Sequence, residues 1–324
     1  MKRAAHRADR CVLVISPALD DHARAVLAEL HRLGARVARF DTARFPEHAA
    51  LALGMSGVEP WSGALRPARG RPIDPSAVGA VWWRRPWPHR LHPSLRGPRR
   101  DGAYCAAHAA MGAFLGAADA LRVNDPRADE MDDDKPRQLA LAAHLGLAVP
   151  RTLVTNDPVA ARAFIAERRD GETIHKNVTS ARALWRATAV ARASDRALLA
   201  SLKHVPLLFQ ERVPAATDVR ATFVGDEVFA AEITYPRGGH ALDWRVDFRR
   251  TVVAPVKLPL TVEGRLFRLV RALGLVYAAV DLRRRPDGEH VFLEVNPSGQ
   301  WLFAERATGQ PITAALAALL AGVR

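Results

Sequence analysis

Residues 277–299 read YAAVDLRRRPDGEHVFLEVNPSG, two runs rich in apolar residues on either side of a Pro-Asp-Gly turn. This pattern predicts a β-hairpin. Glu294 and Asn296 are two residues apart on the second strand, so their side chains face the same way. A two-residue turn sets Asp281 of the first strand directly opposite Glu294, whereas a three-residue turn displaces it by one position. The sequence leaves this register open.

Asp281, Glu294 and Asn296 give the sharpest chemical signal in the chain. Two carboxylates that face each other across a sheet repel. With the amide oxygen they form an all-oxygen set that suits Mg²⁺, a hard cation that keeps water and phosphate ligands beside a few carboxylates. A surface hairpin with ordinary charges is the competing interpretation. The apolar neighbours in FLEVN and the loop-like PSGQ that follows favour the metal site.

Lysine is rare in this chain. It occurs only at residues 2, 135, 176, 203 and 257, while 42 cations are arginine, so each lysine is an informative choice. Lys135 is at the head of a predicted helix and Lys176 lies in an apolar strand. Either one alone is more often a solvated cation than a ligand-binding residue.

A third signal is the segment FQERV (209–213), whose main chain between strand and loop could offer N–H and C=O groups to a purine. Asp218 and Arg220 follow on one strand face, and DWR adds Arg245. The order of two lysines, hinge, arginine, aspartate and Glu-x-Asn has a physical logic, with cations on phosphates and a metal between them. Phosphoryl transfer is catalysed mostly by such positioning and charge neutralisation.

Composition narrows the classes of protein. The 324 residues carry a formal net charge of +13 and are 49% hydrophobic and 25% charged, which suits a folded chain of two or three domains and excludes disordered or collagen-like proteins. The arginine excess is spread along the chain, so nucleic acid is not indicated as a partner. Without a bilayer-spanning apolar run or a signal peptide, we expect no membrane partner and a cytoplasmic protein. Cys11 and Cys105 lack CxxC spacing, which excludes a disulfide framework or zinc module.

The N-terminal third reads as an α/β unit. A buried strand at 11–18 leads to a helix that begins at Asp20 or Asp21 and ends at Gly34, and a second strand follows at 35–41. The turn has no GxGxxG, so a dinucleotide site has no support. Further along the chain we expect a strand at 80–86 and a helix at 103–121.

Strands dominate the rest of the chain, with helices between them. We expect most of these strands to be antiparallel. Helices are predicted at 132–146, from Asp157-Pro158 to Arg168, at 261–274 and near the C-terminus. The predicted fold class is α/β followed by α+β.

The sequence resembles a known family, the ATP-grasp superfamily, and within it the peptide maturases of graspetide (microviridin-type) biosynthesis. The stretches that carry the resemblance are VWWRRP (81–86), VNDP (123–126), DKPRQLALAAHLGLAVPRTLVTNDP (134–158), FQERVPAATDVRATFVGDEVFAAEI (209–233), DWR (243–245) and DLRRRPDGEHVFLEVNPSGQWLFAERATGQPI (281–312). The resemblance implies a pre-ATP-grasp domain over 1–124, a central ATP-grasp subdomain over 125–205 and a C-terminal ATP-grasp subdomain over 206–324.

The resemblance also implies roles for particular residues, with ATP and Mg²⁺ as cofactors. By position, the residues expected to bind the nucleotide are Lys135 and Lys176 on the phosphates, Gln210, Glu211 and Val213 as the adenine hinge, and Asp218 at the ribose. Asp281, Glu294 and Asn296 would hold Mg²⁺, and Arg220 and Arg245 would stabilise the transferred phosphoryl group or the acyl phosphate. One departure is NVTSARALWRAT after the second lysine, which lacks the glycines of the usual lid loop.

The implied activity is that of an ATP-dependent ligase. It would phosphorylate Asp or Glu side chains of a ribosomal precursor peptide, with a leader and an acidic core, and close ω-ester or ω-amide rings with Ser/Thr or Lys. Trp82, Trp83, Arg84 and Arg85 could line the peptide groove, or the tryptophans could be core residues. Two alternatives stay open, a RimK-like glutamate ligase and an inactive nucleic-acid-binding or regulatory protein. A homodimer is left open as well.

Overall fold

The computed structural model describes residues 10–131, 134–179, 188–214, 217–235 and 251–323. The chain forms two compact units. The first comprises Met1–Pro126 and Pro311–Arg324, and the second comprises Arg127–Gln310. Within the described ranges no helix is both long enough and apolar enough to cross a bilayer.

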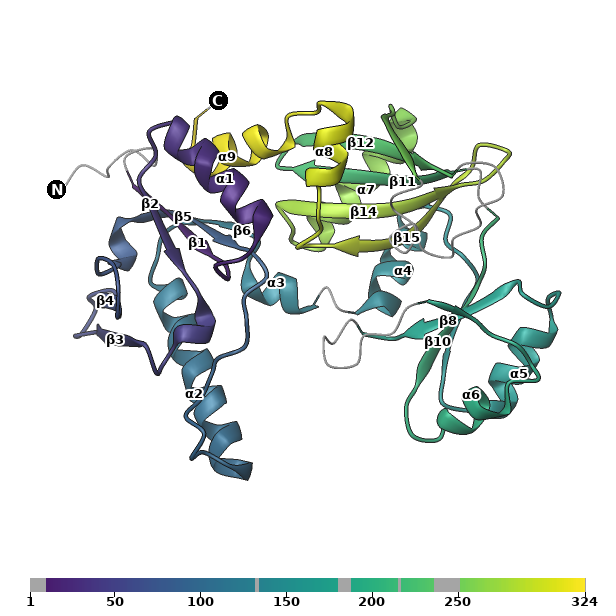
Figure 1. Ribbon diagram of the computed structural model, residues 1–324, viewed down its shortest axis with the longest axis horizontal. Coiled ribbons are helices and arrows are strands. Elements are labelled where there is room, and N and C mark those ends of the chain that lie inside the picture. The colour runs from purple at the N-terminus through teal and green to yellow at the C-terminus, as the bar shows by residue number, and fades with distance from the viewer. Residues whose placement is uncertain (1–9, 132–133, 180–187, 215–216, 236–250, 324) are drawn as a thin grey trace. The chain divides into compact units, whose positions relative to one another are not determined.

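A four-stranded parallel sheet with strand order β2-β1-β5-β6 forms the centre of the first unit. Its strands are β1 (Cys11–Ile15), β2 (Val37–Phe40), β5 (Val78–Trp83) and β6 (Leu121–Val123), and an antiparallel hairpin adds β3 (Ala49–Gly54) and β4 (Ser62–Pro67). The helices are α1 (Asp21–Arg32), α2 (Gly97–Gly116) and α9 (Ile312–Ala321). Helices α1 and α9 pack together on one side of the sheet and α2 lies on the other (Figure 1).

The expected βαβ start is confirmed in detail. The Asp20 carboxylate accepts a hydrogen bond from the Ala23 N–H at 2.8 Å and caps α1, and Gly34 ends the turn after the helix with a φ of 71°. Helix α2 begins six residues before the expected 103 because the Gly97-Pro98 pair supplies a favourable first turn. It also ends earlier than expected, at Gly116.

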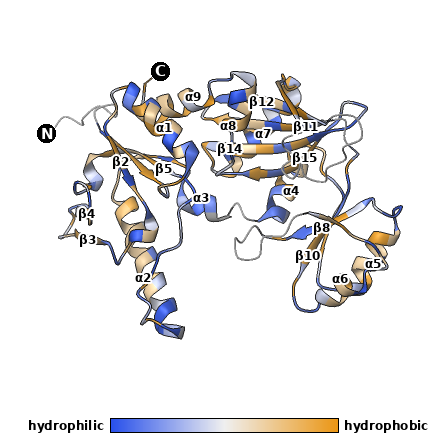
Figure 2. Ribbon diagram, viewed as in Figure 1, coloured by the Kyte–Doolittle hydropathy of each residue, from blue (hydrophilic) through white to orange (hydrophobic). Residues whose placement is uncertain are grey.

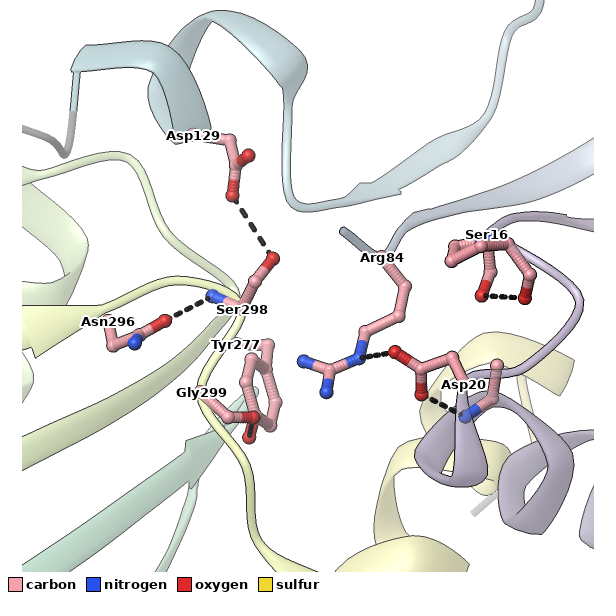
Figure 3. Close-up of polar contacts among 10 residues, drawn as sticks. Ser16, Asp20, Arg84, Asp129, Tyr277, Asn296, Ser298 and Gly299 are labelled. Atoms are coloured by element: carbon pink, nitrogen blue, oxygen red, sulfur yellow. Dashed lines mark hydrogen bonds and ion pairs between the residues drawn. The ribbon is translucent and has the colours of Figure 1, made fainter. Parts of the chain in front are cut away.

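Trp82 and Trp83 are core residues, with exposed fractions of 2% and 8%. Trp83 packs in the core cluster with Phe114 of α2, and alternation turns Trp82 to the opposite side of the sheet. The interpretation in which these tryptophans line a peptide groove is therefore wrong, because neither ring is available at the surface. Arg84 is buried as well, and its Nε lies 3.3 Å from the Asp20 carboxylate (Figure 3).

The second unit contains two antiparallel sheets, as the sequence predicts for this part of the chain. The smaller has strand order β7-β10-β8-β9, formed by β7 (Thr152–Thr155), β10 (Leu207–Glu211), β8 (Thr173–Asn177) and β9 (Ala189–Val190). Helices α5 (Pro158–Ala166) and α6 (Arg196–Ser201) share a hydrophobic cluster with Leu207 and Phe209 on one side of it. Asp157 caps α5, as its Asp-Pro sequence predicts.

The larger sheet has strand order β13-β12-β11-β14-β15. Its strands are β11 (Thr217–Val224), β12 (Glu227–Thr234), β13 (Val252–Pro255), β14 (Tyr277–Arg284) and β15 (His290–Asn296). The remaining helices of the unit are α3 (Pro126–Met131), which also takes in the last residue of the first unit, α4 (Lys135–His144), α7 (Leu260–Ala272) and α8 (Leu302–Thr308). One face of the sheet packs on α4 and α7 to form the main hydrophobic core.

The C-terminal helix α9, which the sequence analysis places in the C-terminal ATP-grasp subdomain, packs on α1 and β5 of the first unit. Figure 2 shows why it needs such a burial site, since α9 is apolar along its length, whereas α3 is mostly hydrophilic. The division into domains at 124 and 205 stays a prediction. Helix α8 and strand β13 have no counterpart among the expected elements.

Candidate functional site

The face of the larger sheet opposite its core is polar. Val219, Ala221 and Phe223 of β11 lie in the core, so the alternate residues Asp218 and Arg220 face the other way. The same alternation on β14 sends Val280 and Leu282 to the core and Asp281 and Arg283 to the polar face. Four charged side chains therefore stand on two adjacent strands, and we call this set, with Glu294 and Asn296 of β15, the polar face.

A three-residue turn and a bulge in β15 together determine the register of the hairpin. The turn has three residues, because the Arg285 N–H donates to the Glu289 oxygen across residues 286–288. That turn alone would offset Asp281 from Glu294. A bulge in β15 shifts the register back, so that Leu282 pairs with Phe292 but Asp281 pairs with Glu294.

The bulge also decides which side chains reach the core. Phe292 and Val295 are three residues apart, yet both lie in the main hydrophobic core. In a regular strand they would face opposite ways, and the extra residue at Leu293 makes the pattern consistent. Glu294 and Asn296 are left on the polar face.

One ion pair lies within the polar face, and another joins the polar face to α4. Arg220 Nη1 lies 2.9 Å from Asp281 Oδ1, with both side chains largely buried. Lys135 Nζ, at the start of α4, lies 3.6 Å from Glu294 Oε2. The structure thus brings together Lys135, Arg220, Asp281 and Glu294, which the sequence analysis selected from three separate segments.

Asn296 begins a turn that holds the following loop. Its Oδ1 accepts a hydrogen bond from the Ser298 N–H at 3.0 Å, and the Ser298 hydroxyl donates to Asp129 Oδ1 at 3.3 Å (Figure 3). Gly299 lies against β14, where a Cβ would come within 2.2 Å of the Ala279 Cβ, so only glycine fits. The Tyr277 hydroxyl donates to the Gly299 oxygen at 2.8 Å. The NPSG segment is therefore packed on the sheet beside the polar face.

Asp218 is 4% exposed and has two partners on its carboxylate. Arg283 Nε lies 2.7 Å from Oδ1 and its Nη2 lies 3.3 Å from Oδ2, a bidentate pair, and the Tyr235 hydroxyl donates to Oδ2 at 2.6 Å. Arg283 also donates to the Val213 oxygen at 3.4 Å. Both oxygens of Asp218 thus accept from neighbouring side chains, and the ribose contact that the resemblance implies stays a prediction.

The expected adenine hinge lies where β10 ends. Strand β10 pairs with β7 through Gln210 and with β8 through Glu211, and the Arg212 N–H donates to the Glu172 oxygen. The Gln210 side chain donates to the Thr152 hydroxyl at 2.9 Å. The Glu211 carboxylate lies 3.1 Å from Arg285 Nη2 of the hairpin turn. The chain leaves the sheet at Val213, which is 3% exposed.

Lys176 lies on β8 directly opposite Leu208 of β10. Residues opposite each other in an antiparallel pair share a face, and Leu208 belongs to the main core with α4 and the larger sheet. Lys176 therefore lies on the side of the smaller sheet that faces α4, not on the side covered by α5 and α6. Arg245, predicted from DWR, falls outside the described residues, as does the glycine-free stretch from 180 to 187.

Three residues of the site have long-range partners and were not selected from the sequence. Arg283 pairs with Asp218, Asp129 accepts from Ser298, and Gln138 bonds the backbone of Val295. Arg283 follows Asp281 by two residues and so had to share its face, a signal that the alternation rule already contained. Nothing in the local sequence marks Asp129 or Gln138.

The donor set fits Mg²⁺ in chemistry. Asp281, Glu294 and Asn296 offer carboxylate and amide oxygens from adjacent strands, and all three side chains are only partly buried. Within the described ranges no group of three or more His, Cys, Asp or Glu is arranged to hold a metal. The protein would thus supply only part of a coordination shell, as is usual for Mg²⁺ bound with phosphates.

Sequence comparison is consistent with this geometry. A family profile described as the MvdD pre-ATP grasp domain matches residues 11–130, and one described as the RimK-like ATP-grasp domain matches residues 132–320. The second match spans more than half of the chain. The chain belongs to the RimK-like ATP-grasp family. No curated protein sequence matches it.

Several solved structures of ATP-grasp proteins are similar to it over both units. The macrocyclase MdnC from Microcystis aeruginosa MRC, bound with precursor peptide MdnA, is 26% identical with a TM-score of 0.82, and the match covers 96% of this chain and 99% of MdnC. A RiPP-associated ATP-grasp ligase from Chryseobacterium gregarium, in complex with ADP and a leader and core peptide, is 25% identical with a TM-score of 0.83 and 97% coverage of each chain.

A third relative is the ATP-grasp ligase PsnB, complexed with a phosphomimetic variant of its minimal precursor, Mg and ADP. It is 28% identical with a TM-score of 0.76, covering 97% of this chain and 98% of PsnB. A RimK domain ATP-grasp protein from Sphaerobacter thermophilus DSM 20745 is 17% identical with a TM-score of 0.58, which shows a shared fold alone. The predicted fold class, with a pre-ATP-grasp domain followed by an ATP-grasp fold, is confirmed.

Proposed function

We propose that this ATP-grasp protein is an ATP-dependent ligase that activates Asp or Glu side chains of a ribosomally made precursor peptide and closes ω-ester or ω-amide rings. The observation that carries the proposal is the similarity to peptide macrocyclases along both units, since it includes the N-terminal pre-ATP-grasp domain and not only the catalytic fold. The polar face supplies the chemistry that such a ligase needs.

The nucleotide is proposed to bind between the two sheets of the second unit. Lys135 and Lys176 would neutralise its phosphates, and main-chain groups of Gln210, Glu211 and Val213 would meet the adenine. Support comes from the position of Lys135 beside Glu294 and from Lys176 on the face of the smaller sheet that it shares with Leu208 of β10. Asp218 is proposed at the ribose, with its carboxylate also bound by Arg283 and Tyr235.

Mg²⁺, when bound, would shield the charge of the phosphates and hold them in line for transfer. Asp281, Glu294 and Asn296 are proposed as its ligands. A bound cation would also compete with Lys135 for Glu294 and with Arg220 for Asp281. The side chains released by that competition carry positive charge and would be available to bind the phosphates.

The reaction has two steps. An oxygen of the peptide carboxylate attacks the γ-phosphorus, the bond to the β-phosphate oxygen breaks, and ADP leaves. A Ser or Thr hydroxyl, or a Lys amine, of the same peptide then attacks the acyl carbon, loses its proton and expels inorganic phosphate. Arg220 and Arg245 are proposed to bind the negative charge that develops on the phosphoryl and acyl oxygens.

A RimK-like glutamate ligase is the second candidate, because the family profile over 132–320 is RimK-like. It would join a free amino acid to a peptide or protein carboxylate and not form a ring. The RimK domain structure resembles the chain less closely than the macrocyclases do, with a TM-score of 0.58 against 0.82. The macrocyclase proposal is therefore preferred.

Peptide-dependent ADP release tests the proposal. A cognate precursor should stimulate ADP release in the presence of Mg²⁺, and a precursor whose core Asp and Glu residues are changed to Asn and Gln should not. Equal stimulation by both peptides would mean that the carboxylates are not the phosphoryl acceptors and would refute the proposal.

A further inference from the structure

The amide side chain of Gln138 takes the place of a neighbouring strand at the edge of the larger sheet. Strand β15 is the last strand in the sheet order, so one side of its backbone faces outward. There Gln138 Nε2 donates to the Val295 oxygen at 3.0 Å, and the Val295 N–H donates to Gln138 Oε1 at 2.8 Å. Gln138 is 2% exposed, so both bonds are shielded from water.

The residue whose backbone forms hydrogen bonds with Gln138 lies between two proposed metal ligands. Val295 is flanked by Glu294 and Asn296, whose side chains point to the polar face. A displacement of the Val295 peptide groups would move both ligands together. Gln138 therefore acts on the proposed metal site through the backbone of β15.

Gln138 also fixes the helix that carries a proposed phosphate-binding lysine. Lys135 and Gln138 are three residues apart on α4, a spacing that puts them on the same face of a helix. Lys135 Nζ lies 3.6 Å from Glu294 Oε2. Gln138 thus links the N-terminal part of α4 to the strand that bears Glu294.

Other contacts keep α4 on the sheet without Gln138. Leu139 and Ala142 of the helix lie in the main hydrophobic core, and the Phe292 N–H donates to the Ala148 oxygen at 2.8 Å beyond the C-terminal end of the helix. The contribution of Gln138 is therefore local, at the N-terminal turn of α4 where Lys135 stands.

We propose that Gln138 is a positioning residue for the nucleotide site, which holds Lys135 and the Glu294-x-Asn296 strand at the spacing that Mg²⁺ and the ATP phosphates require. This inference rests on the proposed function. The two bonds to the Val295 backbone need a side chain that both donates and accepts. Glutamine does both, whereas leucine does neither and an ionised glutamate only accepts.

The first test compares Gln138→Leu and Gln138→Glu with wild-type protein as full chains. Partners of metal ligands typically contribute about 10- to 100-fold in metal affinity or activity. We therefore expect the Mg²⁺ concentration for half-maximal ADP release and the KM for ATP to rise by about 10-fold or more, while the KM for the peptide stays within about 2-fold. Gln310→Leu is the matched control, because Gln310 Nε2 also donates to a strand oxygen, that of Ala230, at 3.1 Å.

A second readout needs neither nucleotide nor turnover. Hydrogen exchange of the protein without ligands should be faster at the Val295 amide in Gln138→Leu, while amides of β11 in the core keep their protection. Calorimetric titration with Mg²⁺ and ADP should give a Kd about 10-fold weaker than that of wild type. Faster exchange together with unchanged Mg²⁺, ADP and ATP affinities would overturn the inference, because Gln138 would then be structural only.

A double-mutant cycle decides whether Gln138 acts through Lys135. Lys135→Met and Gln138→Leu should each weaken Mg²⁺·ADP binding, and the double variant should lose less than the two effects multiplied. Effects that multiply fully would contradict the inference. Wild-type protein that binds no Mg²⁺·ADP would refute the proposed function itself, a result distinct from wild-type binding that Gln138→Leu leaves intact.

Discussion

Asp281 and Glu294 lie directly opposite each other in the β14–β15 pair, although a three-residue turn joins their strands. The opposition depends on the bulge at Leu293, which corrects the offset that the turn introduces. Each carboxylate has a cation beside it, Arg220 for Asp281 and Lys135 for Glu294. Two like charges can face each other across a sheet here because each has a basic partner within 4 Å.

Removal of one carboxylate should stop the reaction and leave the fold intact. Glu294→Gln and Asp281→Asn are each expected to lower peptide-dependent ADP release by about 100-fold or more, since one carboxylate cannot replace two around Mg²⁺. The exposed Glu227→Gln serves as the control on the same sheet. Near-wild-type turnover in either variant would remove that residue from the metal site.

The two lysines can be tested through thermal stability. A ligand that binds only the folded state raises the melting temperature, so Mg²⁺·ATP should stabilise the wild-type protein. Lys135→Ala and Lys176→Ala should each shrink that shift, while Lys203→Ala, an exposed lysine, should keep it. A full shift in both site variants would mean that these lysines do not contact the phosphates.

The Arg283–Asp218 pair should matter for stability. Both side chains are at least nine-tenths buried, and removing one partner of a buried pair typically costs about 3–5 kcal/mol because the other charge is left uncompensated. Arg283→Met is expected to lower the free energy of unfolding in urea by that order. Asp218→Asn combined with Arg283→Met should recover part of the loss. A single variant as stable as wild type would show that the pair does not hold β11 to β14.

Acid stability of the first unit should depend on His22. Burial, reinforced by the nearby Arg84 guanidinium, lowers the pKa of His22 to about 3 from a usual value of 6.5. Between these values the unfolded chain binds more protons than the folded chain, so stability should fall as pH drops from 6.5 toward 3. His22→Gln should flatten that slope, and the exposed His31→Gln should not. Identical slopes in wild type and His22→Gln would contradict the buried neutral histidine.

The sequence predicted features that depend on neighbouring residues. Asp157-Pro158 predicted the start of a helix, and the two-residue spacing of Glu294 and Asn296 predicted that their side chains share a face of the strand. The bulge at Leu293 escaped prediction because it follows from packing Phe292 and Val295 into one core, a tertiary requirement. Gln138 and Val295 are 157 residues apart in the chain, so no local pattern could connect them. The short helix α8 has only seven residues and shows too few turns for a periodic signal.

The VWWRRP segment is a case in which an interpretation from residue type was wrong. Its aromatic and basic residues suggested a surface for the peptide, but β5 is one of the two inner strands of the parallel sheet and is buried along its whole length. Both tryptophan side chains are buried in the core, and Arg84 forms an ion pair with Asp20, the N-cap residue of α1. Residue type alone could not separate a binding surface from a core.

The most direct test of the account is the mass of a cognate precursor after incubation with the protein, ATP and Mg²⁺. Each ring closed through an acyl phosphate removes one water, so the account predicts discrete species that have lost whole waters, and trapping of the activated carboxylate as a hydroxamate when hydroxylamine is present. A precursor that gains the mass of a free amino acid would support the glutamate ligase instead. An unchanged precursor, with Mg²⁺·ATP binding verified, would contradict the central claim.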